Sequence, residues 1–439
     1  MKFQLGYWEL PEEYVKLIRK VVNDYNKASS DPKLTSTSLD GLHYYRDLSK
    51  RFRAGGAPDM FYCYSDLNSR LLWKGWTGLL EDFIPESAHY KDEISSKQYL
   101  KSIVSKDGSL FSIPYYSSHT AFLYNEKHLQ RAGFSEPPKD WNQLEEQATR
   151  LRERGICKTP VLVPLHGDGS VETLYSVILG FNPPSKSYLF DESDAPVFDQ
   201  VNSPLYNVMK WLVDGIYRKR IVSRQTVAYD VIPAGEAMKR GEFTFVWVPW
   251  YNLPHINHPN GRKWSSIKQA VNPGYGYTTC YIRTYTASID ALKSGSQRLA
   301  GLWKVLQYLG GKTNERLEPD FKRGTFRTAK RLALEIGVPS PYDALWEDEE
   351  YCSALDHWGD VQTYKAQDKR VYNSLNDPNS PPWLAEWNGE WAPAPLRNTV
   401  HSILWRDMSG PEILGALKKL AGKWNELKRN YDRRPKRES

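Results

Sequence analysis

The sequence predicts an α/β fold built on a parallel sheet. Short apolar segments alternate along the chain with segments of helical periodicity, which is the pattern of parallel α/β sheets. With 439 residues, 40% of them hydrophobic and 25% charged, the chain is long enough for two or three domains and too apolar to be disordered. No stretch approaches the roughly 18 to 20 uninterrupted apolar residues of a membrane span.

The first strand–helix pairs lie near the N-terminus. Lys2–Tyr7 alternates as a strand does, and Pro11 then opens an amphipathic helix that extends to Tyr25. Asp59–Tyr64 reads as a short buried strand, and helical spacing resumes from Leu67 to Trp73. Ligands bind beyond the carboxyl ends of strands in such sheets, so polar and aromatic residues at these ends are of interest.

A turn and a further strand–helix pair follow. Asp107-Gly108 predicts a hairpin turn, and Pro114 breaks the run after it. Ala121–Tyr124 is another strand, Gly133 is placed to end a helix, and a new helix runs from Trp141 to Arg154.

The remaining predicted elements lie before and after a Trp-rich segment. Residues 343–391 show only weak periodicity and indicate an extended loop or an insertion. The other segments predict strands at Thr159–Pro164 and Glu242–Val248, and helices at Val171–Leu179, Gly235–Arg240, Gln297–Leu309, Leu396–Trp405 and Pro411–Leu427.

Several motifs occur in an order that is specific as a set. They are Gly56-Ala57-Pro58-Asp59-Met60 with Ser65-Asp66, Asp107–Tyr116, Leu123–Lys127, Ala132-Gly133 with Pro137–Trp141, and Gly241–Val248 with Pro249-Trp250-Tyr251. Together they resemble family 1 of the bacterial extracellular solute-binding proteins of ABC importers, in the carbohydrate-binding group that includes the maltose-binding protein. Asp140 stands where that family usually has Thr.

The resemblance implies a two-lobe periplasmic-binding-protein fold with discontinuous lobes, a hinge and an inter-lobe ligand cleft. The N-terminal lobe would comprise residues 1–114 and about 278–330, and the C-terminal lobe 115–277 and about 331–439. The protein would capture a sugar or oligosaccharide with high affinity and deliver it to the transmembrane permease of an ABC transporter. No catalytic residue, cofactor or metal is expected, and we expect a monomer.

The resemblance also implies a periplasmic or extracellular location, with the protein either free or anchored as a lipoprotein. Met1–Leu10 is too short and too polar for the apolar part of a signal peptide. The formal charge is +7, but the tail Lys428–Ser439 contributes +4 of it. Since the basic excess is concentrated in one tail, we expect no nucleic-acid partner.

Candidate ligand-binding residues come from the strand ends and from the family's pattern. A flat ring matches the apolar face of a sugar, and carboxylates at its rim accept charge-assisted hydrogen bonds. Trp250 has core packing as its alternative role, and Asp66 has helix capping. The candidates are Trp8, Glu9, Tyr44, Ser65, Asp66, Tyr115, Tyr116, His119, Asp168, Glu172, Trp250, Tyr251, Trp391 and Arg397.

The alternative function is a glycoside hydrolase with an aromatic-lined cleft. Glu386 and Glu390 would then be the first carboxylates to examine, because hydrolysis needs two carboxyl groups facing one bond. His255 and His258 lack an evident third partner for a metal. No CxxC pair occurs among the four cysteines, so zinc-ribbon and thioredoxin-type proteins are excluded.

Overall fold

The computed structural model consists of two compact units that share two strands. It describes residues 1–9, 12–40, 43–105, 107–167, 170–182, 189–191, 193, 195–257, 266–372 and 391–432. Of these, unit 1 holds 1–118 and 280–355, and unit 2 holds 119–279, 356–372 and 391–432. The strands β4 (Ile113–Asn125) and β8 (Thr278–Ala287) each begin in one unit and end in the other, and the last three residues of helix α16 (Glu349–Trp358) also fall in unit 2.

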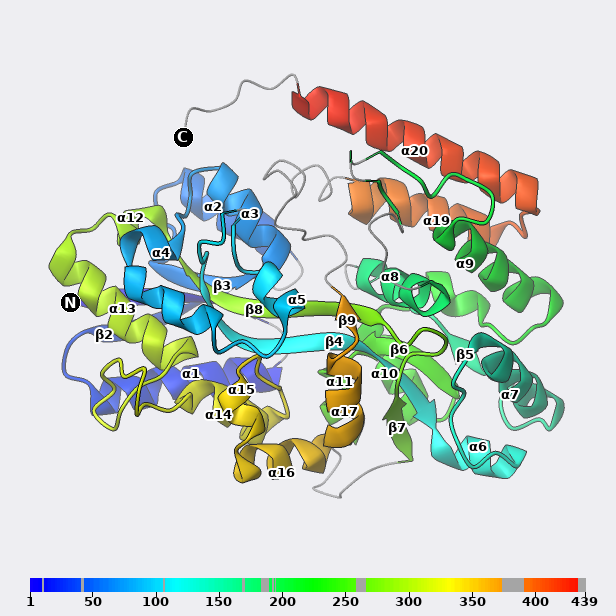
Figure 1. The fold of residues 1–439 in the computed structure, drawn as a ribbon, viewed down its shortest axis with the longest axis horizontal. Helices are drawn as coiled ribbons and strands as arrows, with labels where there is room; N and C mark the ends of the chain where they lie inside the picture. The colour runs from blue at the N-terminus through cyan, green and yellow to red at the C-terminus, as the bar shows by residue number, and fades with distance from the viewer. Residues whose placement is uncertain are drawn as a thin grey trace. The chain divides into compact units, whose positions relative to one another are not determined.

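Unit 1 is a sheet covered by helices on both faces. Its strands besides β4 and β8 are β1 (Lys2–Trp8), β2 (Lys33–Leu39) and β3 (Met60–Tyr64). Its helices are α1 (Glu12–Ala28), α2 (Tyr44–Arg53), α3 (Ser65–Trp73), α4 (Leu80–Phe83), a 3₁₀ helix (Pro85–Lys91), α5 (Lys97–Lys101), α12 (Ile289–Leu292), α13 (Ser296–Gly310), α14 (Arg327–Ile336), α15 (Asp343–Trp346) and α16 (Glu349–Trp358). Helices α1 and α14 lie on one side of the sheet, and α2 and α3 on the other (Figure 1).

The strand order in unit 1 is β2-β1-β3-β8. β1 runs parallel to β2 and β3, with Leu5 opposite Met60, as the alternation of elements predicted. β8 runs antiparallel to β3, with Tyr64 opposite Arg283, so the prediction of a wholly parallel sheet is wrong at this strand. The exception arises because β8 brings the chain back from unit 2 and therefore enters the sheet from the opposite end.

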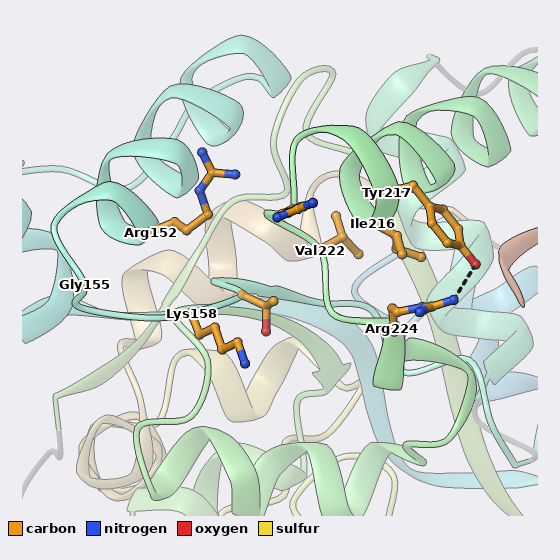
Figure 2. Close-up of a pocket in the computed structure, with 9 residues that line it drawn as sticks. Arg152, Gly155, Lys158, Ile216, Tyr217, Val222 and Arg224 are labelled. Atoms are coloured by element: carbon orange, nitrogen blue, oxygen red, sulfur yellow. Dashed lines mark hydrogen bonds between the residues drawn. The ribbon is translucent and has the colours of Figure 1, made fainter. Parts of the chain in front are cut away.

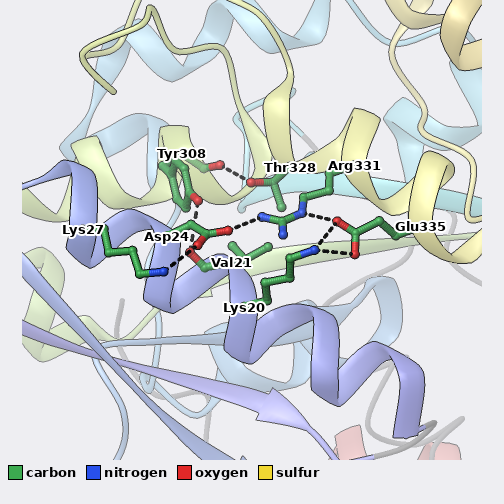
Figure 3. A network of polar contacts seen from close by, with 8 residues as sticks. All are labelled: Lys20, Val21, Asp24, Lys27, Tyr308, Thr328, Arg331 and Glu335. Atoms are coloured by element: carbon green, nitrogen blue, oxygen red, sulfur yellow. Dashed lines mark hydrogen bonds and ion pairs between the residues drawn. The ribbon is translucent and has the colours of Figure 1, made fainter.

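Helix α1 shows why the N-terminal prediction was correct. Its apolar residues recur at a spacing of three and four, and all of them are buried. They are Tyr14, Val15, Leu17, Ile18, Val21, Val22 and Tyr25. Pro11, which was expected to open this helix, lies outside the described residues. At the other end of the helix, Asp24 pairs with Arg331 of α14, and Tyr308 of α13 donates to the Val21 carbonyl (Figure 3).

Unit 2 combines a short sheet with a larger set of helices. Its strands besides β4 and β8 are β5 (Val161–Leu162), β6 (Phe245–Pro249), β7 (Ile267–Ala270) and β9 (Val371–Tyr372). Its helices are α6 (Glu126–Ala132), α7 (Trp141–Glu153), α8 (Ser170–Phe181), α9 (Pro204–Val213), a π-helical turn (Asp214–Arg218), a 3₁₀ helix (Arg224–Val227), α10 (Val231–Lys239), α11 (Asn252–Asn257), α17 (Val361–Asp368), a π-helical turn (Ala392–Leu396), α19 (Arg397–Trp405) and α20 (Gly410–Asp432).

In unit 2 the start of α7 at Trp141 and the end of α6 at Gly133 are as the sequence predicted. The carboxylate of Asp140 accepts from the Gln143 amide at 2.8 Å and so begins α7. Gly133 ends α6 with φ of 87°, a conformation that glycine adopts without steric cost. β6 pairs in parallel with β5 and antiparallel with β4, whose other edge receives β7.

Two predictions about irregular segments are wrong. Pro114 does not break a strand, because it is the second residue of β4, where a missing amide hydrogen is tolerated. The extended loop predicted from residue 343 is wrong as far as residue 372, because the chain there forms helices α15, α16 and α17 and the short strand β9; the alternative of an insertion stays a prediction. The short length of these helices explains the weak periodicity. None of the described helices combines the length and hydropathy that crossing a bilayer requires.

The C-terminal helices of unit 2 are joined by an aromatic cluster. The Trp424 ring of α20 is 1% exposed, and its centroid lies 4.0 Å from the Phe190 centroid with the planes 23° apart. Trp391, fully buried, meets Trp424 edge-on at 5.0 Å and Phe198 at 5.7 Å. These rings fix α20, the long helix shown in red in Figure 1, to its unit.

Substituting Trp424→Ala is expected to lower the free energy of unfolding by about 3–5 kcal/mol, because it leaves a large cavity beneath α20. Urea denaturation followed by circular dichroism measures the loss. Lys418→Gln on an exposed face of the same helix serves as the matched control. If both variants unfolded at the same urea concentration, the cluster would not hold α20.

Candidate ligand-binding site

The candidate site of unit 1 lies where β1 and β3 end. Trp8 is the last residue of β1 and Tyr64 the last of β3. The two strands are parallel neighbours, so both residues lie at the carboxyl edge of the sheet. Arg283 of β8 is the partner of Tyr64 in the sheet and is brought to the same edge.

Aromatic rings line this edge. The half-buried Trp8 ring lies parallel to that of Tyr62, with centroids 5.8 Å apart and planes at 16°. Tyr62 and Tyr64 are two residues apart in β3, and their ring centroids lie 6.4 Å apart. Tyr62 is only 3% exposed, so the rings that a ligand could reach here are those of the half-buried Trp8 and Tyr64. A flat apolar ring is suited to the C–H face of a sugar.

The half-buried Arg283 adds hydrogen-bond donors to the same surface. Its guanidinium carbon lies 5.4 Å from the ring centroid of Tyr64 and 5.0 Å from that of Tyr281. Its Nε donates to the hydroxyl of Tyr116 at 3.3 Å. A guanidinium carries five N–H donors in a fixed plane, and such donors bind hydroxyl, carboxylate or phosphate oxygens.

A buried group of phenols supports this surface from within unit 1. Tyr115 stacks on Tyr285 with centroids 4.3 Å apart, and its hydroxyl lies 2.9 Å from that of Tyr14. Burial raises the pKa of each of these phenols above its usual value, so all three remain neutral. Tyr115 is therefore a core residue in this structure, while its neighbour Tyr116 orients Arg283.

The other predicted residues of unit 1 differ in how exposed their side chains are. Glu9 is exposed directly after Trp8. Tyr44 is buried, and its hydroxyl donates to the Tyr62 carbonyl behind the rings. Ser65 and Asp66 are the first two residues of α3, and their side chains lie outside the described part.

The corresponding edge of unit 2 lies at the end of β6. Trp250 follows this strand, and its backbone amide donates to the His119 carbonyl of β4 at 2.9 Å. The ring centroid of Tyr364 from α17 lies 4.5 Å from that of His119 and 5.1 Å from that of Trp250. Trp250 is only 1% exposed, so the ring is packed inside unit 2.

The remaining predicted residues of unit 2 are dispersed. Tyr251 is half-buried after Trp250, and Glu172 is half-buried in α8. Arg397 is half-buried at the start of α19 and lowers the pKa of His401, after the larger effect of burial. Trp391 belongs to the aromatic cluster beneath α20, and Asp168 lies outside the described residues.

Sequence reasoning missed Tyr64 and Arg283, and also the buried rings of Tyr62 and Tyr281 that pack against this edge. The signal was present as a period of two, since Tyr281, Arg283 and Tyr285 alternate in β8 just as Tyr62 and Tyr64 do in β3. The pairing of β3 with β8, far apart in the sequence, was what could not be foreseen. Within the described residues, no group of three or more His, Cys, Asp or Glu side chains could hold a metal ion.

The chain belongs to the family of bacterial extracellular solute-binding proteins, whose model matches residues 8–309. Its fold is the two-lobe α/β fold of the periplasmic binding proteins. It superposes on maltose-bound T. maritima MalE3 with a TM-score of 0.76 and 16% identity, over 97% of this chain and 99% of that one. MalE, a sugar-binding protein from Xanthomonas citri, matches with a TM-score of 0.74 and 15% identity, over 99% and 100% of the two chains.

A more limited relationship links the chain to the sn-glycerol-3-phosphate-binding periplasmic protein UgpB of Escherichia coli K12. The two are 26% identical over 163 residues. This match spans 35% of the chain and 36% of the relative's length.

The buried imidazole of His119 gives a pH dependence that can be measured. Burial lowers the pKa of His119 from 6.5 to about 3, so the unfolded state binds more protons than the folded state between these values. The stability that the neutral His119 contributes is therefore fully present above about pH 6.5 and is lost as the pH falls towards 3. Between pH 7 and 4.5, wild type is expected to lose about 2–3 kcal/mol more stability than His119→Gln.

Urea denaturation at the two pH values measures that difference, and the other titrating groups cancel because both proteins contain them. NMR of the His119 ring carbons gives an independent reading, since the ring should not titrate above pH 4.5. An inflection of its shifts near pH 6.5 would show that the imidazole is accessible to protons.

Proposed function

We propose that the chain captures a sugar or oligosaccharide at the carboxyl edge of the unit 1 sheet and delivers it to an ABC transporter permease. The observation that carries the proposal is the half-buried Trp8 ring, stacked on the buried Tyr62, at the same sheet edge as the donors of Arg283. Solved relatives support the ligand class. MalE3 was solved with maltose, and Lmo0181 of Listeria monocytogenes, TM-score 0.72 at 13% identity over 97% of this chain and 98% of that one, with cycloalternan.

The energies are of the right size for capture. Removing about 50 Å² of apolar surface from water by stacking is worth on the order of 1 kcal/mol. Hydrogen bonds from a charged guanidinium to sugar hydroxyls contribute about 1.5–3 kcal/mol each. A few such contacts reach the roughly 8 kcal/mol of a micromolar complex, provided that the rings are already in place. The Tyr116 hydroxyl and the phenols beneath it supply that preorganisation.

Binding without chemistry fits the surface as well. The described residues of this edge present rings, the Arg283 cation and a single carboxylate, that of Glu9, whereas glycoside hydrolysis requires a pair of carboxyl groups facing one bond. In this proposal the protein acts outside the cytoplasmic membrane, and β4 and β8, the strands shared by both units, act as the hinge.

Isothermal titration calorimetry with maltose, maltotriose, cyclic glucans, uronates and sn-glycerol 3-phosphate tests the proposal. We expect at least one saccharide to bind with a dissociation constant of about 10 µM or lower. Recovery of the saccharide uncut, with no new reducing ends, would separate capture from hydrolysis. If no saccharide bound, the proposed ligand class would be wrong.

One observation favours a second ligand class, an anionic polyol such as a glycerol phosphate. Arg283 is a cation at the ligand edge, and the 163-residue match to UgpB points to the same chemistry. The two classes differ in salt dependence, because attraction between Arg283 and a phosphate weakens as ionic strength rises. Binding of a neutral saccharide should change little between 20 and 300 mM salt.

Trp8→Ala is expected to weaken saccharide binding about tenfold, or about 1.4 kcal/mol, because it removes one stacking face. The half-buried position of Trp8 means that the melting temperature should fall by only a few degrees. Titration and a thermal melt of the same sample measure both quantities. Trp405→Ala, at an exposed tryptophan of unit 2, is the control and should bind as wild type does. Unchanged affinity in Trp8→Ala would place the saccharide elsewhere.

A further inference from the structure

Unit 2 contains a hollow of about 600 Å³ that is separate from the residues discussed so far. It is lined by the end of α7, the loop after it and the turn that follows α9. Arg152 comes from α7 and Lys158 from the loop, while Tyr217 and Arg224 come from the other side (Figure 2). The volume is that of a pocket for a small organic molecule.

The lining of this hollow is strongly cationic. Arg152, Lys158, Arg220 and Arg224 contribute four positive charges, and no carboxylate is among the lining residues. Arg152 makes only a long ion pair with its neighbour Glu153, with guanidinium nitrogen and carboxylate oxygen 4.0 Å apart. Cations just outside the hollow are paired more closely, since Lys219 lies 2.6 Å from its carboxylate partner. The charge that gathers in the hollow is therefore suited to an anion that comes from solution.

Two of these cations are held in place by hydrogen bonds. Arg224 donates through Nη2 to the Tyr217 hydroxyl at 3.2 Å, as Figure 2 shows. The single hydrogen of that hydroxyl lies between the carbonyls of Leu404 and Trp405, whose oxygens are 3.0 and 2.7 Å from the hydroxyl oxygen. Arg152 donates to the Lys219 carbonyl. Side chains held in this way lose less entropy when they bind an anion, which favours affinity.

Arg220 differs from the other cations of the hollow in its backbone conformation, which is unfavourable for an arginine. Its φ of 55° is left-handed, at the end of the π-helical turn where the Ile221 and Val222 amides both donate to the Gly215 carbonyl. Glycine or asparagine is the usual residue in that conformation, because an ordinary side chain strains it. An arginine at this position places a charge in the hollow at the expense of local stability.

The floor of the hollow is apolar. Ile216 and Val222 are buried there, and the Tyr217 ring lies beside them, 4.9 Å from the guanidinium of Arg224. A bare inorganic ion would leave this surface and most of the volume unfilled. An arginine fork binds phosphate through two parallel hydrogen bonds, and a lysine adds a point charge.

We propose that this hollow is a second binding site, which takes an organic phosphate: the phosphoryl group lies among Arg152, Lys158, Arg220 and Arg224, and the carbon skeleton lies on Ile216 and Val222. The site is independent of the carbohydrate edge of unit 1. The phosphate has two conceivable sources, a soluble phosphate ester or the headgroup of an anionic phospholipid. Trp405, whose carbonyl accepts from Tyr217, is 65% exposed, and an exposed indole would favour a lipid interface.

Titration of the full chain with 1-naphthyl phosphate at low salt tests the site. We expect saturable binding with one equivalent, at least tenfold tighter than inorganic phosphate, and weaker at 300 mM salt. 1-Naphthol, which has the ring without the charge, should not bind. Absence of saturable binding of 1-naphthyl phosphate would overturn the proposal.

Arg220→Asn is a variant that should remain folded. Asparagine tolerates the left-handed conformation, so the melting temperature should stay the same or rise while affinity for 1-naphthyl phosphate falls at least tenfold. Arg224→Gln should weaken binding as well, and Lys418→Gln on α20 removes the same charge without effect. Saccharide binding should be unchanged in all three. Wild-type affinity in both Arg220→Asn and Arg224→Gln would refute the site.

Flotation with vesicles of phosphatidylcholine, with and without 30% phosphatidylglycerol, identifies the source. Binding to the anionic vesicles that is lost in Arg220→Asn and weakened in Trp405→Ala would support a lipid headgroup. Binding of 1-naphthyl phosphate without vesicle binding would support a soluble ester. Vesicle binding that is unaffected by Arg220→Asn would count against the hollow as the point of contact.

Discussion

The order in which strands pair in unit 1 determines where its binding chemistry can be. Parallel pairing of β1 with β3 brings Trp8 and Tyr64 to one edge, and antiparallel pairing of β3 with β8 adds Arg283 to it. A slip of one residue in either register would turn these side chains to the opposite face of the sheet. The buried phenols of Tyr14, Tyr115 and Tyr285 oppose such a slip, since each ring packs against partners from distant parts of the chain.

Local signals in the sequence predicted much of the fold. The spacing of apolar residues in α1, the start of α7 at Trp141 and the glycine that ends α6 each depend on a few neighbouring residues, and each was predicted correctly. β2 was missed because its sequence, KLTSTSL, is too polar to resemble a buried strand. The antiparallel entry of β8 was missed because it depends on the path of the chain through unit 2.

The candidate site was harder to predict than the fold. An exposed and a buried indole look alike in a sequence, and only packing distinguishes the half-buried Trp8 from Trp250 and Trp391, which are enclosed in unit 2. Arg283 lies within an apolar strand and carried no local sign of its neighbours. The high aromatic content therefore has two causes, a ring-lined edge in unit 1 and ring-filled cores in both units.

The two shared strands also have a consequence for the order in which the protein acquires its structure. Met60 pairs with Ala287, so the sheet of unit 1 cannot be completed until a segment more than two hundred residues later has been made. By then nearly all of the residues of unit 2 that precede β8 have already emerged from the ribosome. A chain with this long-range pairing should fold slowly. Until β8 is in place, the N-terminal half should expose an unpaired strand edge.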